Sequence, residues 1–348
     1  MRIVQISTFE ESVPPKKYGG VELVIYNLIQ EFSKRGHKVF LIGTGDSKTN
    51  AEILPVFERA IRTLPEAKDM KIRDSLKFVG AGKILEILQN VKADIIHNHL
   101  GWRLFPFLPL IKIPVVTTLH GPLDIKYQQM VYGRFKKENY VSISNSQRRP
   151  FPDLNYAATV YNGIEIEKFP FSERPGNYLA FLGRMSPEKG PVQAIEVAKR
   201  VGMKLKMAAK VDAVDIEFFE ANVKPLIDNK QVEFLGEIGH KAKTELLKNA
   251  LALLTPIQWH EPFGLYFIEA MACGTPVIAL NKGSVPEIIK DGETGFIANS
   301  TKEMTEAVKN IKKINRHDCR ARVEKYFTSE KMAAGYEKVY YKILGKKK

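Results

Sequence analysis

Cysteine is scarce in this chain of 348 residues, which contains only Cys273 and Cys319. Two cysteines make neither a disulfide framework nor a metal-binding pair, and they favour a reducing compartment. Long apolar runs are lacking as well. The longest one, residues 104–119, is interrupted by Lys112 and three prolines, so the sequence predicts no membrane-spanning helix.

The sequence also lacks the features of an exported protein or of a metal site. Met1-Arg2 leads directly into a short strand-like run, without the apolar segment of a signal peptide, so we expect a cytoplasmic protein. No Asp-x-Asp pattern occurs, although this pattern is expected where a metal ion holds a nucleotide diphosphate. His97, His99 and His120 have no cysteine or carboxylate cluster at ligand spacing beside them. We therefore predict no metal and no other cofactor.

The chain has no dedicated basic arm, although 53 basic and 39 acidic residues give it a net charge of +14. Residues 1–170 hold 24 basic and 17 acidic side chains, and the rest hold 29 and 22, so each part carries +7. This even spread argues against nucleic-acid binding. One local run is basic, with only Glu138 opposing it: Lys126, Arg134, Lys136, Lys137, Arg148 and Arg149. It is either a solvated face or a peripheral contact with the inner face of a membrane.

Short apolar strands alternate with amphipathic helices, which is typical of a parallel sheet covered by helices. Strands are predicted over residues 1–7, 37–43, 93–99, 114–120 and 140–145, with helices over 21–34 and 80–90. After a polar break at 165–177, strands follow over 178–185, 204–210, 232–238, 252–257 and 275–280, with helices over 191–202, 215–228, 240–250 and 284–290. Residues 50–79 give no clear pattern.

This rhythm predicts an α/β protein with two Rossmann-like, doubly wound parallel-sheet domains that face a cleft. We expect the first domain over 1–165, the second over 166–325, and a C-terminal helix over 326–348 that can pack back on the first domain. Ligands of such sheets bind beyond the carboxyl ends of the strands.

The stretch HEPFGLYFIEAMACGTPVI, residues 260–278, places two glutamates eight positions apart. Glu261 lies in a Pro/Gly-rich loop, and the helix starts at about Gly264, so Glu269 lies in its second turn among apolar residues. A buried carboxylate needs hydrogen-bond donors. These could be the hydroxyls of a ribose, a backbone N–H, or a Lys or Arg from another element.

Three further motifs stand at predicted strand ends. Gly19-Gly20 open a helix whose N-terminus could attract an anion. In FLGRMSPEKG, residues 181–190, Arg184 and Lys189 flank one strand-to-helix turn and suit a diphosphate. His120 ends the strand before Gly121. Each motif has a simpler alternative. Gly19-Gly20 could be an ordinary loop junction, Arg184 and Lys189 could be solvated surface cations, and His120 could be bonded to a backbone carbonyl.

Together these motifs resemble the retaining glycosyltransferases of family 4, which have the GT-B fold. Glu261 and Glu269 match the family's E-x7-E spacing, and the run CGTPVIALNKGSVPEIIKDGETGF at 273–296 is similar to its donor-site segment. GGVE (19–22), TLHG (118–121), VYNGI (160–164) and FLGRMSPEKG also resemble family motifs. Many relatives have two adjacent glycines where this chain has Gly283-Ser284, which leaves the sugar specificity open.

The resemblance implies a metal-independent hexosyltransferase that uses a nucleotide-sugar, with a UDP-hexose favoured over GDP-mannose. Arg184 and Lys189 would neutralise the diphosphate, and Gly19 and Gly20 would present backbone to it. Glu269 would bind the ribose and Glu261 the sugar. The donor site would also include Phe263, Gly264 and Leu265. His120 would lie at the reacting side of the sugar, and front-side displacement is the preferred mechanism.

Other functions remain open at this stage. A nucleotide-sugar epimerase, a phosphorylase and a non-catalytic nucleotide-sugar-binding subunit share the same fold. The acceptor could be a sugar, a lipid-linked sugar or a small molecule.

Overall fold

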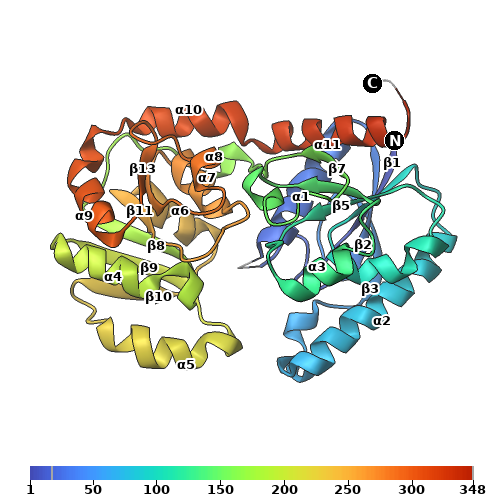
Figure 1. Ribbon diagram of the computed structural model, residues 1–348, viewed down its shortest axis with the longest axis horizontal. Coiled ribbons are helices and arrows are strands. Elements are labelled where there is room, and N and C mark those ends of the chain that lie inside the picture. Colours follow the sequence, from blue (N-terminus) through green and yellow to red (C-terminus); the bar gives the residue numbers. More distant parts are fainter. Residues whose placement is uncertain (17–18, 347–348) are drawn as a thin grey trace. The chain divides into compact units, whose positions relative to one another are not determined.

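The computed structural model describes residues 1–16 and 19–346, and the chain in it divides into two compact units. The first unit consists of Met1–Gly163 and Ser329–Lys348, and the second is Ile164–Thr328 (Figure 1). The sequence had placed the corresponding boundaries after residues 165 and 325. The C-terminal segment thus belongs to the unit that contains the N-terminus.

The first unit is built on a sheet of seven parallel strands in the order β3-β2-β1-β4-β5-β6-β7. The strands are β1 (Arg2–Ile6), β2 (Lys38–Thr44), β3 (Glu52–Phe57), β4 (Ile95–Asn98), β5 (Val115–Leu119), β6 (Asn139–Ser142) and β7 (Tyr156–Thr159). The two strands that sequence patterns missed, β3 and β7, are the edges. Both strands are partly exposed, β7 has only four residues, and β3 contains Pro55, which an edge strand tolerates because one side of its backbone has no neighbouring strand.

The α-helices among the described residues of the first unit are α1 (Gly20–Lys34), α2 (Met70–Gln89), α3 (Lys126–Tyr132) and α11 (Ser329–Ile343), and a long 3-10 helix spans Gly101–Leu110. The C-terminal helix α11 packs on α1 (Figure 1). The rings of Phe32 and Tyr340 are centred 5.5 Å apart in this contact. Glu337 of α11 is buried and accepts from Nε2 of His37 at 2.8 Å. An aromatic contact and a buried polar contact therefore hold the chain end in this unit.

The second unit contains six parallel strands in the order β10-β9-β8-β11-β12-β13. They are β8 (Tyr178–Arg184), β9 (Lys204–Lys210), β10 (Val232–Gly236), β11 (Ala252–Thr255), β12 (Val277–Leu280) and β13 (Gly295–Ala298). Its helices are α4 (Pro191–Arg200), α5 (Ile216–Phe218), α6 (His240–Lys248), α7 (Leu265–Ala272), α8 (Val285–Ile288), α9 (Thr301–Asn310) and α10 (Arg316–Tyr326).

One predicted helix of this unit is broken. Instead of a continuous helix over 215–228, α5 passes into a π-helical turn at Phe219–Val223 and then a 3-10 turn at Lys224–Leu226. Pro225 explains the break, because proline lacks the N–H of a helical hydrogen bond and clashes with the preceding turn.

In each sheet the strand order reverses once, between β1 and β4 in the first unit and between β8 and β11 in the second. Loops diverge at such a point and leave room for a ligand beyond the carboxyl ends of the strands. His120 follows β5, Arg184 ends β8, and Glu261 lies between β11 and α7. The residues that the sequence singled out thus lie at the carboxyl edges of the two sheets.

Candidate functional site

The loops that follow β8 and β11 touch through their backbones at the switch point of the second sheet. Gln258 N donates to Glu188 O at 2.7 Å. Gly190 has φ 72°, and a Cβ there would lie 2.1 Å from Pro256 O, so only glycine fits this approach. This close contact brings Lys189, just before α4, next to Glu261.

Lys189 and Glu261 form a largely buried ion pair, with Nζ donating to Oε2. The same carboxylate oxygen accepts from Tyr266 Oη at 2.7 Å and from Trp259 Nε1 at 3.3 Å. Both aromatic rings also face the ammonium group, with centroids 5.1 Å (Trp259) and 5.0 Å (Tyr266) from Nζ. All three donors use one oxygen of Glu261, and Oε1 accepts no hydrogen bond from the residues that the structure describes.

Arg184 also lies between carboxylates. Its Nη2 donates to Glu188, and its Nε lies 3.0 Å from Oδ2 of Asp215. Burial tends to raise the pKa of Glu188, but hydrogen bonds from backbone and Ser186 and the charge of Arg184 lower it overall. The pKa of Asp215 is raised, because its desolvation outweighs the attraction of Arg184. The charge of the guanidinium group is therefore compensated by two carboxylates of the second unit, Glu188 and Asp215.

Glu269 is buried, with 4% of its surface exposed, and it lies in the second turn of α7 as predicted. Its partner is a lysine from another element, since Lys243 Nζ of α6 donates to Oε1 at 2.5 Å. That pairing compensates the buried charge. Oε2 of Glu269 accepts no hydrogen bond from the described part of the chain and remains available to hydroxyl donors.

The start of α7 is held tightly by its neighbours. Gly264 precedes the helix with φ 82°, and Leu265 is its first residue. Phe263 is 2% exposed and its ring packs edge-on against Phe327, so this side chain belongs to the core. Only its backbone can serve a ligand.

The loop after β12 closes over the backbone of Glu261. A Cβ on Gly283, which has φ 59°, would lie 2.4 Å from both N and O of Glu261. Ser284 is buried, donates from N to Glu261 O at 2.9 Å and from Oγ to Phe263 O at 2.8 Å. Ser284 thus fixes the loop that carries Glu261.

In the first unit, Gly20 begins α1 and Gly19 precedes it in an extended conformation. A Cβ on Gly19 would lie 2.6 Å from Cβ of Pro15 and 3.0 Å from Oε2 of Glu22, so glycine is required here by the chain itself. Glu22 is buried, which raises its pKa, and Thr8 Oγ1 donates to it. Lys17 and Tyr18, within the same predicted loop, lie outside the described residues.

His120 joins a buried polar network at the carboxyl ends of β1, β4 and β5. Its Nε2 lies 2.8 Å from Nδ1 of His99, whose Nε2 lies 2.8 Å from Oε1 of Gln5. His97 lies beside His99, with ring centroids 3.9 Å apart. Burial lowers the pKa of His97 and His99 well below the usual value and that of His120 to about 4. The three rings are therefore neutral at neutral pH.

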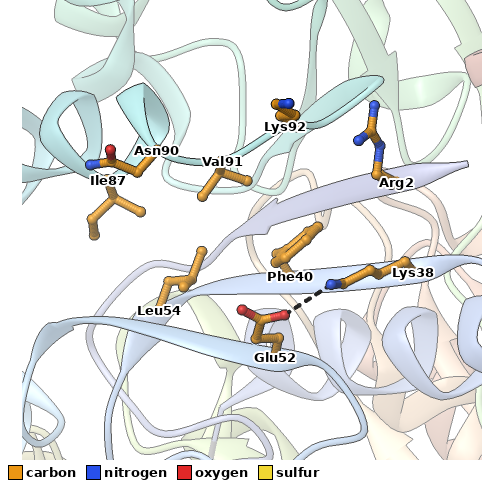
Figure 2. A pocket seen from close by; sticks show the side chains of 9 residues that line it. All are labelled: Arg2, Lys38, Phe40, Glu52, Leu54, Ile87, Asn90, Val91 and Lys92. Carbon is orange, nitrogen blue, oxygen red and sulfur yellow. Dashed lines mark ion pairs between the residues drawn. The ribbon is translucent and has the colours of Figure 1, made fainter.

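The described residues at this site form no cluster of metal ligands. Within residues 1–16 and 19–346, no three His, Cys, Asp or Glu side chains are gathered as metal ligands. A groove in the first unit lies at the opposite, amino ends of the strands (Figure 2). Lys38 and Glu52 form an ion pair in it, and Arg2, Phe40 and Lys92 also line it. It is separate from the carboxyl edge on which His120 lies.

Sequence patterns missed several partners of the predicted residues. Trp259 and Tyr266 flank Glu261 in the chain, so their proximity was a usable clue. Lys243 and Asp215 offered none, because each is a single charge on an otherwise ordinary segment. Lys210 ends β9 directly beside Arg184 in register, pairs with Asp212 at 3.0 Å, and was also missed.

Comparisons with known proteins place both halves of the chain in related groups. Residues 164–327 match the family described as Glycosyl transferases group 1, and residues 18–168 match the one described as Glycosyltransferase Family 4. Together the two matches extend over most of both units.

Two curated relatives are 26% identical to the chain. One is an uncharacterised glycosyltransferase of Methanocaldococcus jannaschii, with 93% of this chain and 95% of the relative covered. The other is the N-acetyl-alpha-D-glucosaminyl L-malate synthase of Bacillus anthracis, with 94% of each covered.

Among solved structures, the Anabaena protein HepE in complex with UDP-glucose is similar, with a TM-score of 0.74 and 16% identity. The match covers 98% of this chain and 100% of that one. At this identity the likeness shows the fold alone. It confirms the GT-B class as two parallel-sheet α/β domains.

Proposed function

This chain belongs to the family 4 glycosyltransferases, and we propose that it moves a hexose from a nucleotide-sugar to an acceptor hydroxyl with retention at the anomeric carbon. The observation that carries the proposal is the meeting of Lys189, Glu261 and the start of α7 at the switch point of the second sheet. A cation, an anion and a helix N-terminus at one strand edge suit a sugar diphosphate.

The second unit would hold the nucleotide through its ribose and its diphosphate. Glu269 would accept from the ribose hydroxyls with Oε2, while Lys243 keeps its charge compensated. Arg184 and Lys189 would exchange their present carboxylate partners for the diphosphate oxygens, which have similar geometry. Phe263, Gly264 and Leu265 would contribute backbone at the start of α7.

The donor sugar would meet Glu261, whose Oε1 is available to its hydroxyls. We propose a UDP-hexose rather than GDP-mannose. The complex of HepE with UDP-glucose supports this choice by analogy of fold. Ser284 would act indirectly, because it donates to the carbonyl oxygens of Glu261 and Phe263 and so holds this loop.

The proposed reaction breaks the bond between the anomeric carbon and the diphosphate oxygen and forms a bond from that carbon to the acceptor oxygen on the same face. The acceptor proton passes to the departing phosphate oxygen. Arg184 and Lys189 would stabilise the charge that develops on the diphosphate, so that no metal ion is needed. His120 of the first unit would orient the reacting side of the sugar, and Gly19 and Gly20 would offer backbone to the phosphates.

A lipid or lipid-linked acceptor would require contact with a membrane. No helix in the described part of the chain is long and apolar enough to cross one. The first unit does expose apolar side chains on α3, where Tyr127 is 55% and Met130 65% exposed. They lie on the basic run of residues 126–149, with Lys126, Arg134 and Lys137 exposed. We define these five residues as the basic α3 surface and propose that it binds anionic lipid.

The test of the donor proposal is a thermal-shift screen with UDP, GDP and ADP and their sugars, followed by incubation with each nucleotide-sugar. A ligand at a hundredfold excess over Kd adds about 2.7 kcal/mol of stability. We expect UDP-sugars to stabilise the protein and to be consumed only when an acceptor is present. Conversion without acceptor would identify an epimerase, and stabilisation without turnover on a panel of acceptors would identify a binding subunit.

A further inference from the structure

The polar network beneath His120 extends through the core of the first unit to the C-terminal helix. Gln5 of β1, His97 of β4, His99 and Tyr340 of α11 are each no more than 3% exposed. Tyr340 comes from a helix that lies more than 300 positions away in the chain yet packs on this unit (Figure 1). So many polar groups in an apolar core must satisfy one another completely.

The amide of Gln5 determines where the protons lie in the branch that leads to His120. Its Oε1 can only accept, so His99 Nε2 carries a proton and donates to it at 2.8 Å. A neutral ring has one N–H, and Nδ1 of His99 is therefore an acceptor. His120 must then donate from Nε2, 2.8 Å away. Its Nδ1 is left as a hydrogen-bond acceptor.

Tyr340 is the hydrogen-bond partner at the other end of that amide. Gln5 Nε2 donates to Tyr340 Oη at 3.3 Å, and Tyr340 Oη lies 2.7 Å from Nδ1 of His97. With one oxygen of Tyr340 accepting from Gln5, its own proton goes to His97. His97 then donates from Nε2 to Thr118 Oγ1 at 2.7 Å. Without the tyrosine hydroxyl, Nε2 of Gln5 would lose this acceptor, and the amide orientation that sets the protons between Gln5 and His120 would lose its contact with α11.

We infer that Gln5 and Tyr340 are positioning residues that, through His99, hold His120 as its Nε2–H tautomer. The inference rests on the proposed role of His120 in glycosyl transfer, and it adds the residues that set the state of that ring. In this tautomer the unprotonated Nδ1 accepts a hydrogen bond from a substrate hydroxyl. In the other tautomer Nδ1 carries a proton and cannot accept. The C-terminal helix therefore contributes to the chemistry of the first unit as well as to its stability.

The experiment compares two tyrosines of the same helix. Tyr340→Phe removes the hydroxyl that accepts from Gln5. Tyr336→Phe removes an equally buried hydroxyl, which contacts Thr118 at 2.9 Å and lies outside the branch to His120. Long-range proton–nitrogen correlations in protein with ring-labelled histidine report each tautomer at pH 7, and kcat and donor KM are measured beside them. Gln5→Met, which removes the amide but keeps its length, is the second variant.

We expect His120 to be the Nε2–H form in the parent protein and in Tyr336→Phe. In Tyr340→Phe and Gln5→Met it should populate both forms, with kcat reduced in proportion to the loss of Nε2–H and donor KM changed less than kcat. An unchanged tautomer in both variants, or an equal shift in Tyr336→Phe, would overturn the inference. The tautomer shifts could occur as expected while His120→Ala retains full turnover. In that case the proposed role of His120 in the reaction is wrong, and the inference that Gln5 and Tyr340 set its tautomer still holds.

Discussion

Lys189 and Glu261, 72 positions apart in the chain, share one buried hydrogen bond at the carboxyl edge of the second sheet. Each is proposed to bind a different part of the donor, the diphosphate and the sugar. In the structure they neutralise one another, and Trp259 and Tyr266 hold the pair in place. Donor binding would replace this internal pair by two separate contacts.

Glu261→Gln should lower turnover without weakening free nucleotide. The substitution keeps the shape but removes the charge that contacts the sugar, and only interactions stronger in the transition state accelerate the reaction. A charge-assisted hydrogen bond is worth about 1.5–3 kcal/mol, so kcat should fall roughly ten- to a hundredfold. Calorimetry should show that the variant binds UDP as tightly as the parent protein or more tightly, because Lys189 no longer pairs with a charged Glu261. A loss of UDP binding in this variant would contradict the assignment.

Glu269→Gln should instead weaken free nucleotide and nucleotide-sugar alike, by roughly ten- to a hundredfold in Kd, because the ribose does not change during reaction. The control is Glu245→Gln on α6, which removes an exposed carboxylate paired with Lys248. Calorimetry on both variants gives the comparison. If the Glu269→Gln protein binds UDP normally, Glu269 does not hold the nucleotide and serves only to pair with Lys243. If the variant unfolds, the carboxylate of Glu269 is needed for the fold.

Turnover should continue in the presence of EDTA. Arg184 and Lys189 provide two positive charges for the leaving diphosphate, which is the task of a metal ion in metal-dependent transferases. The assay compares initial rates with EDTA, Mg²⁺ and Mn²⁺, and we expect them to agree within about twofold. Complete loss in EDTA with recovery in Mg²⁺ would show that the two cations do not suffice.

Anionic vesicles should retain the protein through the basic α3 surface, and the binding should weaken as salt is raised, because salt screens charge attraction. Met130→Ser should reduce co-sedimentation at low salt. Val214→Ser is the matched control, since Val214 is 69% exposed and belongs to the second unit. Absence of pelleting at low salt, or an equal loss in both variants, would reject the proposal.

The first unit should lose stability as the pH falls from about 6.5 to 4. His97, His99 and His120 have lower pKa values folded than unfolded, with His120 at about 4, because burial disfavours their charged forms. In this range the unfolded state binds more protons, so acid favours unfolding. Each pKa unit of difference is worth about 1.4 kcal/mol.

The two tryptophans allow the units to be followed separately. Trp102 lies in the first unit and Trp259 in the second, so the variants Trp259→Phe and Trp102→Phe each report one of them by fluorescence during urea unfolding. The three histidines of the second unit, His240, His260 and His317, are all exposed. A midpoint that falls between pH 7 and 5 equally in both units would argue against the buried histidines as the cause.

Much of the fold could be read from local patterns. The central strands of both sheets are covered on two faces and are therefore largely apolar, as in β8, β11 and β12. The start of α7 was predictable because Pro262 and Gly264 delay the helix. The burial of Glu269 followed from its apolar neighbours. The edge strands β3, β7 and β13 were missed, since β7 and β13 have only four residues each and β3 is interrupted by Pro55.

The partners of the functional side chains were decided by the tertiary structure alone. The sequence by itself determined that Glu269 needs a donor, and it left open whether a ribose, a backbone group or a lysine supplies it. The order of the strands brings Lys243 to Glu269, Lys189 to Glu261, and Tyr340 to Gln5 across 335 positions. Local patterns record which face of a segment is buried. They do not record which segment lies against it, because that depends on the packing of the whole sheet and its helices.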